Sequence, residues 1–304
     1  MKVPYLKSKA KADMLRLSKD LSGSVLSSLE NEVVENRVAS SAWVSGLYPV
    51  FSLLKILDDS KLALNPSREY AMAGAAADGD RSLFLRAISS YQEEAGTSAA
   101  MRRAYRATIF SGFISELRSD LILVLMQGLV YSYRGMAIGL RCALEDLYRH
   151  LYYMDHPQEY LSLVSGESEY SMKLAPKDFR QYLTRTSYLK GFALCSTEFI
   201  KKTKPEDCDW FGINESLYHD LSAAVHGASG RWFAGLENAE SLKINLAKEK
   251  EMNLLVDKFS SLCTVFLVSA HRELFASASD YDKSIVLSVF GDEQKHSFRR
   301  YMNI

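Results

Sequence analysis

The sequence predicts an all-α fold, a multi-helix bundle with an N-terminal helical extension. Apolar residues recur at helical spacing in almost every segment of the 304-residue chain, and the alternation typical of strands is scarce. Only 6 residues are proline, which breaks the interior of helices, so the chain can form long ones. Because strands do not alternate with helices, the usual α/β nucleotide-binding architectures are excluded.

The chain divides into an N-terminal helical extension, residues 1–75, and a main helical body, residues 80–304. Apolar residues follow a helical period over about residues 8–62, and Asn-Pro-Ser at 65–67 is a turn signal. The next stretch, residues 71–80, consists mostly of small residues and contains glycine. We expect this stretch to link the two parts.

Two long helices are expected in the middle of the chain. The first starts at the capping signal Thr97-Ser98 and ends near residues 128–134. The second covers about residues 135–154 and ends at His156-Pro157, because the residue before a proline disfavours helical backbone. Its apolar side chains follow one stripe, which is typical of a helix that faces a core: Leu140, Leu144, Leu147, Leu151 and Met154.

The second half of the chain is expected to hold one capped helix and one long helix. Asn214 or Ser216 can cap the first of these, and Gly227 stops it. The long helix runs over about residues 248–276, and one more helix follows within residues 281–302. Shorter helices are expected at about 157–165, 177–190 and 192–203, and the stretch 232–246 is ambiguous.

The composition restricts the partners and the compartment. With 37 basic and 37 acidic residues the chain has no net charge, so it has no global attraction to nucleic acid or anionic lipid. The uncharged stretch at residues 121–133 is shorter than the roughly 20 residues that span a bilayer. The N-terminus is charged and lacks the apolar core of a signal peptide. We therefore expect a cytoplasmic protein without a membrane segment.

Neither a cofactor nor a metal ion is expected. The chain lacks the GxxxxGK[ST] loop and the GxGxxG, HExxH, EF-hand and GxSxG motifs. His150 and His156 follow Glu145 at intervals that do not match the spacing of metal ligands on a helix.

Three further side chains carry an expectation about burial. Cys142 and Cys263 lie in apolar helical runs, so we expect buried free thiols. His271 is expected on an exposed turn of the long helix, where neighbouring charges pair within the helix.

A set of polar side chains stands out beside the leucine stripe. Arg141 and Glu145 are four residues apart on the second long helix, so they can pair along one face. Tyr218, Ser222 and His226 recur every four residues on a later helix and lie on one side of it. If the two helices pack together, these five residues form one buried polar cluster.

Two interpretations of this cluster are open. In a catalytic cluster, His226 acts as a general acid or base, Arg141 stabilises an anion, and Glu145 orients a group or accepts a proton. Such a set suits phosphodiester cleavage. In the alternative, the cluster is a satisfied polar network that fixes the register of the two helices.

The two helices resemble those of a group of uncharacterised bacterial helical proteins. The resemblance rests on R-x-x-x-E at Arg141 and Glu145 and on Y-x-x-L-S-x-x-x-H from Tyr218 to His226, and it covers roughly residues 100–275. That group is in turn similar to HEPN-like domains, the helical bundles of toxin, antiviral and RNA-cleaving systems. The resemblance implies a role in bacterial stress or phage defence, action on RNA or a nucleotide ligand, and pairing into oligomers.

One departure from the HEPN-like pattern affects the activity that the resemblance implies. Catalytic HEPN domains carry an arginine separated by four to six residues from the active-site histidine, but positions 219–221 hold histidine, aspartate and leucine here. Arg231 follows His226 instead and is the candidate auxiliary cation. Activity as a metal-independent ribonuclease therefore requires that Arg141 or Arg231 supply the charge.

The sequence leads to two functional hypotheses. The first is a HEPN-like protein that acts on RNA or a nucleotide ligand through the polar cluster. The alternative is a non-enzymatic interaction subunit that binds a partner protein and uses the cluster only structurally. A homo-oligomer or a partner protein is expected, because zero net charge leaves RNA binding to a small local site or to a partner's positive surface.

Overall fold

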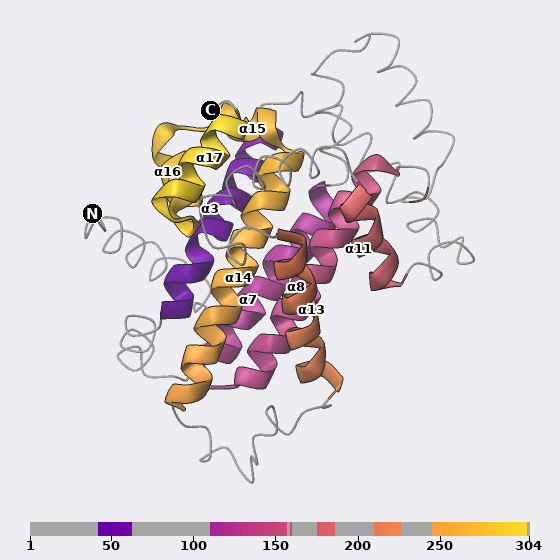
Figure 1. The fold of residues 1–304 in the computed structure, drawn as a ribbon, viewed down its shortest axis with the longest axis vertical. Coiled ribbons are helices and arrows are strands. Elements are labelled where there is room, and N and C mark those ends of the chain that lie inside the picture. The colour runs from indigo at the N-terminus through magenta and orange to yellow at the C-terminus, as the bar shows by residue number, and fades with distance from the viewer. Residues whose placement is uncertain are drawn as a thin grey trace.

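The computed structural model describes residues 42–62, 110–156, 159, 175–185, 210–226 and 245–302 (Figure 1). Helices make up 91% of this part of the chain, and it contains no strand. The predicted all-α multi-helix fold is therefore confirmed for the described residues. Several predictions lie outside them: the linker at 71–80, the cap at 97–98, the helices near 157–165 and 192–203, and the stretch 232–246.

Helices α7 (Ser115–Leu129) and α8 (Tyr133–Asp155) form an antiparallel pair in the middle of the bundle (Figure 1). A π-helical turn at Phe110–Ile114 leads into α7. The turn between the two helices falls within the predicted stretch 128–134, and α8 ends beside His156 as predicted. Both boundaries of this pair were therefore readable from local turn and proline signals.

The turn between α7 and α8 is tight. Tyr131 has a φ of 56°, a left-handed conformation, and the backbone N–H of Ser132 donates to the carbonyl of Gln127 at 2.8 Å. Gly139 allows the two helices to approach, because a Cβ atom there would lie 2.7 Å from the side chain of Val124. The close approach lets the two helices pack as one unit.

Helix α14 (Leu246–Ala270) packs against α3 (Ala42–Leu62) and against α8. Asn245 caps α14, because its Oδ1 atom accepts two backbone N–H groups at 3.1 Å each. Helix α3 lies within the stretch 1–75 that was expected to be an extension, yet it contributes a full face to the core. The predicted boundary near residue 75 lies outside the described residues.

Glu249 ties three helices together at the start of α14. Its Oε1 atom accepts a hydrogen bond from the indole of Trp43 on α3, and its Oε2 atom accepts one from the hydroxyl of Tyr133 on α8, both at 2.9 Å. Gly128 of α7 makes room for the Trp43 ring, since a Cβ atom at this position would overlap the ring. This end of the bundle is therefore held by polar bonds as well as by packing.

Helix α14 is the one helix among the described residues that is long and apolar enough to cross a membrane by length and composition. Within the protein, 67% of its most apolar window is buried. The sequence analysis considered uncharged runs alone, and α14 carries charged residues near its start and at Asp257 and Lys258. The expectation that the chain has no membrane segment stays a prediction.

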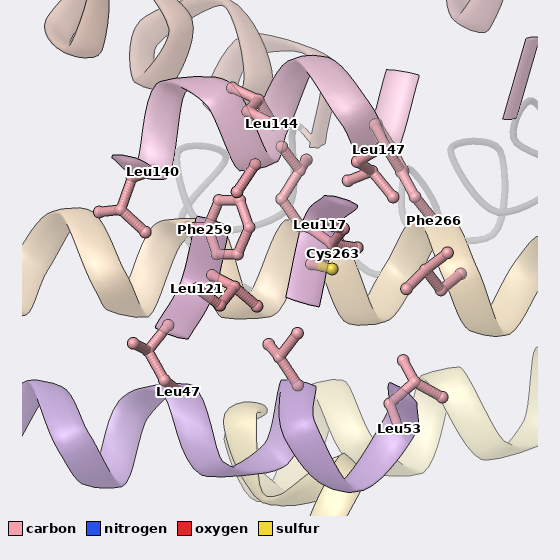
Figure 2. Close-up of a cluster of buried hydrophobic side chains, with 14 of the residues drawn as sticks. Leu47, Leu53, Leu117, Leu121, Leu140, Leu144, Leu147, Phe259, Cys263 and Phe266 are labelled. Carbon is pink, nitrogen blue, oxygen red and sulfur yellow. The ribbon is translucent and has the colours of Figure 1, made fainter. Parts of the chain in front are cut away.

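The core lies where α3, α7, α8 and α14 meet. Every leucine of the predicted α8 stripe is fully buried, and Met154 is 5% exposed. Burial of each such side chain contributes roughly 1.5–3 kcal/mol, so this region supplies most of the favourable free energy of folding. Figure 2 shows this core, with Leu47 and Leu53 of α3, Leu117 and Leu121 of α7, Leu140, Leu144 and Leu147 of α8, and Phe259, Cys263 and Phe266 of α14.

The burial predictions have different outcomes. Cys263 is buried as predicted, but Cys142 is exposed. Cys142 stands two residues after Leu140, which turns it to the opposite side of α8 from the leucine stripe. His271 is 1% exposed, so its predicted place on an exposed turn is wrong. The helix ends at this residue, and the imidazole turns inward toward α8.

Helices α11 (Pro176–Arg185) and α13 (Trp210–His226) cover the other side of α8 (Figure 1). Helix α13 begins earlier than predicted, so Asn214 and Ser216 lie inside it and neither caps it. Asn214 is 1% exposed, and its Oδ1 atom accepts a hydrogen bond from the hydroxyl of Tyr148 at 2.5 Å. Its side chain is therefore used for packing against α8.

The long helix predicted over residues 248–276 is two helices. Helix α14 ends at Ala270, His271 forms a turn, and α15 (Arg272–Ala276) follows. The apolar period continues through the turn, which is why periodicity alone did not locate the break.

The C-terminal stretch 281–302 also contains more than the single helix predicted. It holds α16 (Asp280–Val286), a 3₁₀ turn and α17 (Asp292–Met302). Ser279 caps α16, because its Oγ atom accepts the backbone N–H of Asp282 at 3.1 Å. Figure 1 shows α15, α16 and α17 gathered beside one end of α3.

Candidate functional site

The candidate site lies between α8 and α13, which run antiparallel. Tyr148, late in α8, contacts Asn214 near the start of α13. Arg134, at the start of α8, donates from Nε to the carbonyl of Ala224 near the end of α13 at 3.1 Å. This register brings the two polar stripes together. It unites four of the five predicted site residues: Arg141, Glu145, Tyr218 and Ser222.

Arg141 is at the centre of this group and is only 7% exposed. Its Nη1 atom lies 2.5 Å from Oε1 of Glu145, and its Nε donates to Oγ of Ser222 at 3.2 Å. Its Cζ atom stands 3.6 Å from the ring centroid of Tyr218. A buried guanidinium is costly unless its charge and its N–H groups are engaged. Here the carboxylate of Glu145 pairs with its charge, the hydroxyl of Ser222 accepts from Nε and the ring of Tyr218 covers it, while Nη1 makes no hydrogen bond among the described residues.

Arg180 of α11 joins this group, and no sequence signal pointed to it. Its Cζ atom also stands 3.6 Å from the Tyr218 centroid, and its Nε donates to Oε1 of Glu215 at 2.8 Å. Two guanidinium groups cannot occupy one face of a ring at this distance, so Arg141 and Arg180 cover opposite faces. Burial lowers the pKa of Arg180, but Glu215 and Tyr218 outweigh this effect and raise it. The stack joins α8, α11 and α13.

Tyr148 and Asn214 extend the group into the interior. Tyr148 is fully buried, and its ring centroid lies 6.4 Å from that of Tyr218. Burial raises the pKa of Tyr148, so its hydroxyl stays neutral and donates to Asn214. We call the whole set the polar seam. It consists of Arg141, Glu145, Tyr148, Arg180, Asn214, Tyr218 and Ser222.

His226 lies outside the polar seam, which corrects the predicted five-residue cluster. It is the last residue of α13 and is exposed, and no contact among the described residues joins it to Arg141 or Glu145. A helix turns about 100° per residue, so His226 stands about 80° around the helix from Tyr218. Side chains at i, i+4 and i+8 therefore rotate gradually around α13, and the last of them, His226, no longer faces α8. Arg231, the candidate auxiliary cation, lies outside the described residues.

A second ionisable group lies between α7 and α8, and the sequence analysis did not single it out. The pKa of Asp146 is raised to about 7, chiefly by burial and also by Asp120 of α7, while Arg149 opposes the shift. Nη1 of Arg149 lies 2.9 Å from Oδ1 of Asp146. Burial also raises the pKa of Asp120. Asp146 therefore populates both protonation states near neutral pH.

The described residues contain no group of three or more histidine, cysteine, aspartate or glutamate side chains placed to hold a metal ion. No protein-family model, curated protein or solved structure matches the chain. The resemblance to HEPN-like domains therefore stays a prediction. Fold and site together define an all-α bundle in which one helix, α8, carries an apolar core face and an arginine–tyrosine network.

Proposed function

We propose that the chain is a non-enzymatic interaction subunit, a HEPN-like helical protein that binds a partner protein and uses the polar seam structurally. The proposal rests on the burial of Arg141 within the polar seam. Arg141 is 7% exposed, and its guanidinium is engaged by Glu145, Ser222 and the Tyr218 ring. A substrate anion would have to displace these partners and reach a buried charge.

Exposed apolar side chains on α13 and α14 support the same proposal. Leu246 is 73% exposed and Leu254 57% exposed on α14, and Val225 is 39% exposed on α13. Aliphatic side chains of this size favour contact with protein over contact with water. A second copy of the chain and a different protein are the two kinds of partner that the proposal includes.

A photo-crosslinking amino acid at position 254 tests this proposal in cells. We expect one crosslinked species of defined mass, and its identification by mass spectrometry separates a second copy from another protein. The same amino acid at Lys55, an exposed position of α3, is the matched control. Leu254→Glu, in a correctly folded protein, should abolish the complex. Equal crosslinking at both positions, or a complex unaffected by Leu254→Glu, would contradict the proposal.

The second candidate is a HEPN-like protein of a bacterial stress or phage-defence system that cleaves RNA or binds a nucleotide. One observation favours it. His226 is exposed at the end of α13, and Arg134 reaches the same turn through its bond to the carbonyl of Ala224. An imidazole that transfers protons near neutral pH and a nearby guanidinium are suited to phosphodiester chemistry.

An RNA cleavage assay decides between the two candidates. The second candidate expects purified protein to cleave total RNA, and His226→Ala to abolish cleavage and toxicity on expression. His219→Ala is the matched control, because His219 is also exposed on α13. Absence of cleavage by the wild type removes RNA cleavage from the second candidate and leaves nucleotide binding, which calorimetric titration with nucleotides tests. Cleavage lost in His226→Ala but retained in His219→Ala overturns the non-enzymatic proposal.

A further inference from the structure

Three exposed aliphatic side chains lie on α8 and on the two helices beside it. Leu123 of α7 is 48% exposed, Ile138 of α8 is 36% exposed, and Val225 of α13 is 39% exposed. Helix α8 lies between α7 and α13 and packs against both (Figure 1). We call these three residues the apolar band, because the contacts between the helices place them at one level of the bundle.

The contact between α7 and α8 brings Leu123 and Ile138 together. A Cβ atom at Gly139 would lie against the side chain of Val124, so the residues next to these two positions, Ile138 and Leu123, stand at nearly the same height. Helices α3 and α14 cover the inner side of this helix pair. Exposed side chains beside the contact therefore lie on its outer side, where none of the described helices covers them.

The contact between α8 and α13 adds Val225 and a positive charge. Nε of Arg134 donates to the carbonyl of Ala224 at 3.1 Å, Val225 follows Ala224, and Ile138 lies one turn after Arg134. Arg134 is exposed, and no carboxylate among the described residues forms an ion pair with it. Along the helix axis it stands about 6 Å from Ile138, on the side of the turn between α7 and α8.

Negative charge lies on the opposite side of the apolar band. Glu116 and Asp120 precede Leu123 on α7, and Asp120, the nearer of the two, stands about 4.5 Å from it along the helix axis. The pKa of Asp120 is raised, chiefly by burial and also by the charge of Glu116, while a hydrogen bond with Asp146 and the charge of Arg149 oppose the shift. A cation from outside the chain would therefore be favourable beside Asp120.

Opposite charges at similar distances from an apolar centre are what a symmetric interface requires. Two copies related by a two-fold axis present the same surface to each other, so a group on one side of the axis meets its counterpart from the other side. When the axis passes through the apolar band, the two bands meet, and Arg134 of each copy approaches Asp120 of the other. A different protein would not require this arrangement of charges.

We propose that the face formed by the apolar band, Arg134 and Asp120 pairs two copies of the chain in a symmetric dimer, an inference that rests on the proposed function of an interaction subunit. The dimer covers α7, α8 and α13 and leaves Leu246 and Leu254 of α14 exposed. Those two leucines then remain for a different protein. Burial of the apolar band supplies the attraction, and the two arginine–aspartate pairs fix the orientation.

Sedimentation velocity of the full chain over a dilution series tests the dimer. The wild type should sediment with twice the mass of one chain. Ile138→Glu should raise the dissociation constant at least about tenfold, because it places a charge at the centre of the interface. Leu254→Glu makes a similar change at an exposed position of α14 and should leave the dimer intact. A wild type that stays monomeric up to about 100 μM would overturn the proposal, and so would a dimer that Ile138→Glu leaves intact.

The dimer and the proposed function can fail independently. Photo-crosslinking at position 254 in cells tests binding at α14, and its outcome does not depend on the dimer. A monomeric wild type therefore overturns the dimer alone. Self-association that Leu254→Glu disrupts and Ile138→Glu does not would overturn the proposed face and agree with the proposed function.

Exchange of the two charges tests the orientation of the copies. Arg134→Glu and Asp120→Lys should each weaken the dimer, because each brings like charges together, and the variant with both changes should recover most of the affinity. Thermal unfolding confirms that each variant is folded. Two losses without recovery in the combined variant would contradict the pairing of Arg134 with Asp120.

Cys142 supplies a measurement that needs no variant. It is exposed one turn after Ile138, so a short bismaleimide should join Cys142 of one copy to Cys142 of the other. Mass spectrometry of the digested dimer identifies this pair of linked peptides. A dimer without the link would overturn the proposed face, even if Ile138→Glu does not fold.

Discussion

Helix α8 separates two regions that are held together in different ways. On one side, its leucines pack against α3, α7 and α14 in a core made mostly of apolar contacts. On the other side, the polar seam joins α8 to α11 and α13 through bonds that need particular partners at particular distances. The first region supplies most of the stability, whereas the second fixes the register of the helices.

The difference shows how each region responds to change. A missing methyl group in the core removes apolar contacts and leaves a cavity, at a cost that grows with the lost volume. A missing atom in the polar seam leaves a buried donor or charge without its partner, at a cost set by what remains behind. Substitutions of similar size should therefore lower the free energy of unfolding by different amounts in the two regions. Only in the polar seam should a second substitution recover part of the loss.

The largest effect is expected in the apolar core. Phe259→Ala should lower the free energy of unfolding by about 3–5 kcal/mol, because the fully buried ring leaves a cavity between α8 and α14. Urea denaturation measures this loss. Leu254→Ala on the same helix is the control, and its 57% exposure predicts a change within about 0.5 kcal/mol. Similar losses for both substitutions would show that the core is misidentified.

A steric change at the α3–α7 contact should come next. Gly128→Ala forces a Cβ atom into the ring of Trp43 and should cost about 1–3 kcal/mol. Gly291→Ala is the matched control, because the nearest atom to its Cβ would be 4.0 Å away. Thermal unfolding of both variants compares them. A neutral Gly128→Ala would mean that Trp43 can move aside.

In the polar seam, the test measures the stability lost in a single variant and the part of it recovered in a double variant. Arg141→Met should cost about 1–3 kcal/mol, because it leaves Glu145 and Ser222 without their buried partner. Adding Glu145→Gln should recover part of this loss, because it removes a carboxylate charge that would keep only its longer contact with Arg149 at 3.7 Å. Denaturant unfolding of the single and double variants measures the coupling. Strictly additive losses would contradict the seam as a coupled network.

The smallest effect is expected from pH. Asp146 keeps its proton in the folded state up to a pKa of about 7, whereas an unfolded aspartate loses it near its ordinary value of 3.8. The folded state therefore binds more protons between these values, and this residue makes stability fall as pH rises across that window. Asp146→Asn should remove this slope and raise stability at pH 8 by about 1–2 kcal/mol.

Unfolding curves from pH 5 to pH 8 measure this slope. Asp292→Asn, at an exposed position of α17, is the control and should leave it unchanged. A slope that persists in Asp146→Asn would assign the effect to other groups.

The sequence predicted the apolar region better than the polar one, for a physical reason. A leucine stripe repeats along one helix, so the burial of Leu140 to Met154 follows from periodicity without knowledge of the partner. The pairing of Arg141 with Glu145 was also local and was predicted. Arg180 reaches Tyr218 from a separate helix, and no spacing rule connects them. His226 was misplaced because residues spaced by four rotate gradually around α13. His271 was misplaced because the break after α14 turns its side chain inward.

The bond between Trp43 and Glu249 joins residues that are 206 positions apart in the chain. During synthesis, α3 therefore leaves the ribosome long before the helix that covers it exists. At translation rates of 5–20 residues per second, this interval lasts about 10–40 s, in which the indole of Trp43 and the leucines of α3 lack the cover that α14 supplies. The nascent chain thus offers chaperones an apolar helix for far longer than the microseconds in which such a helix forms.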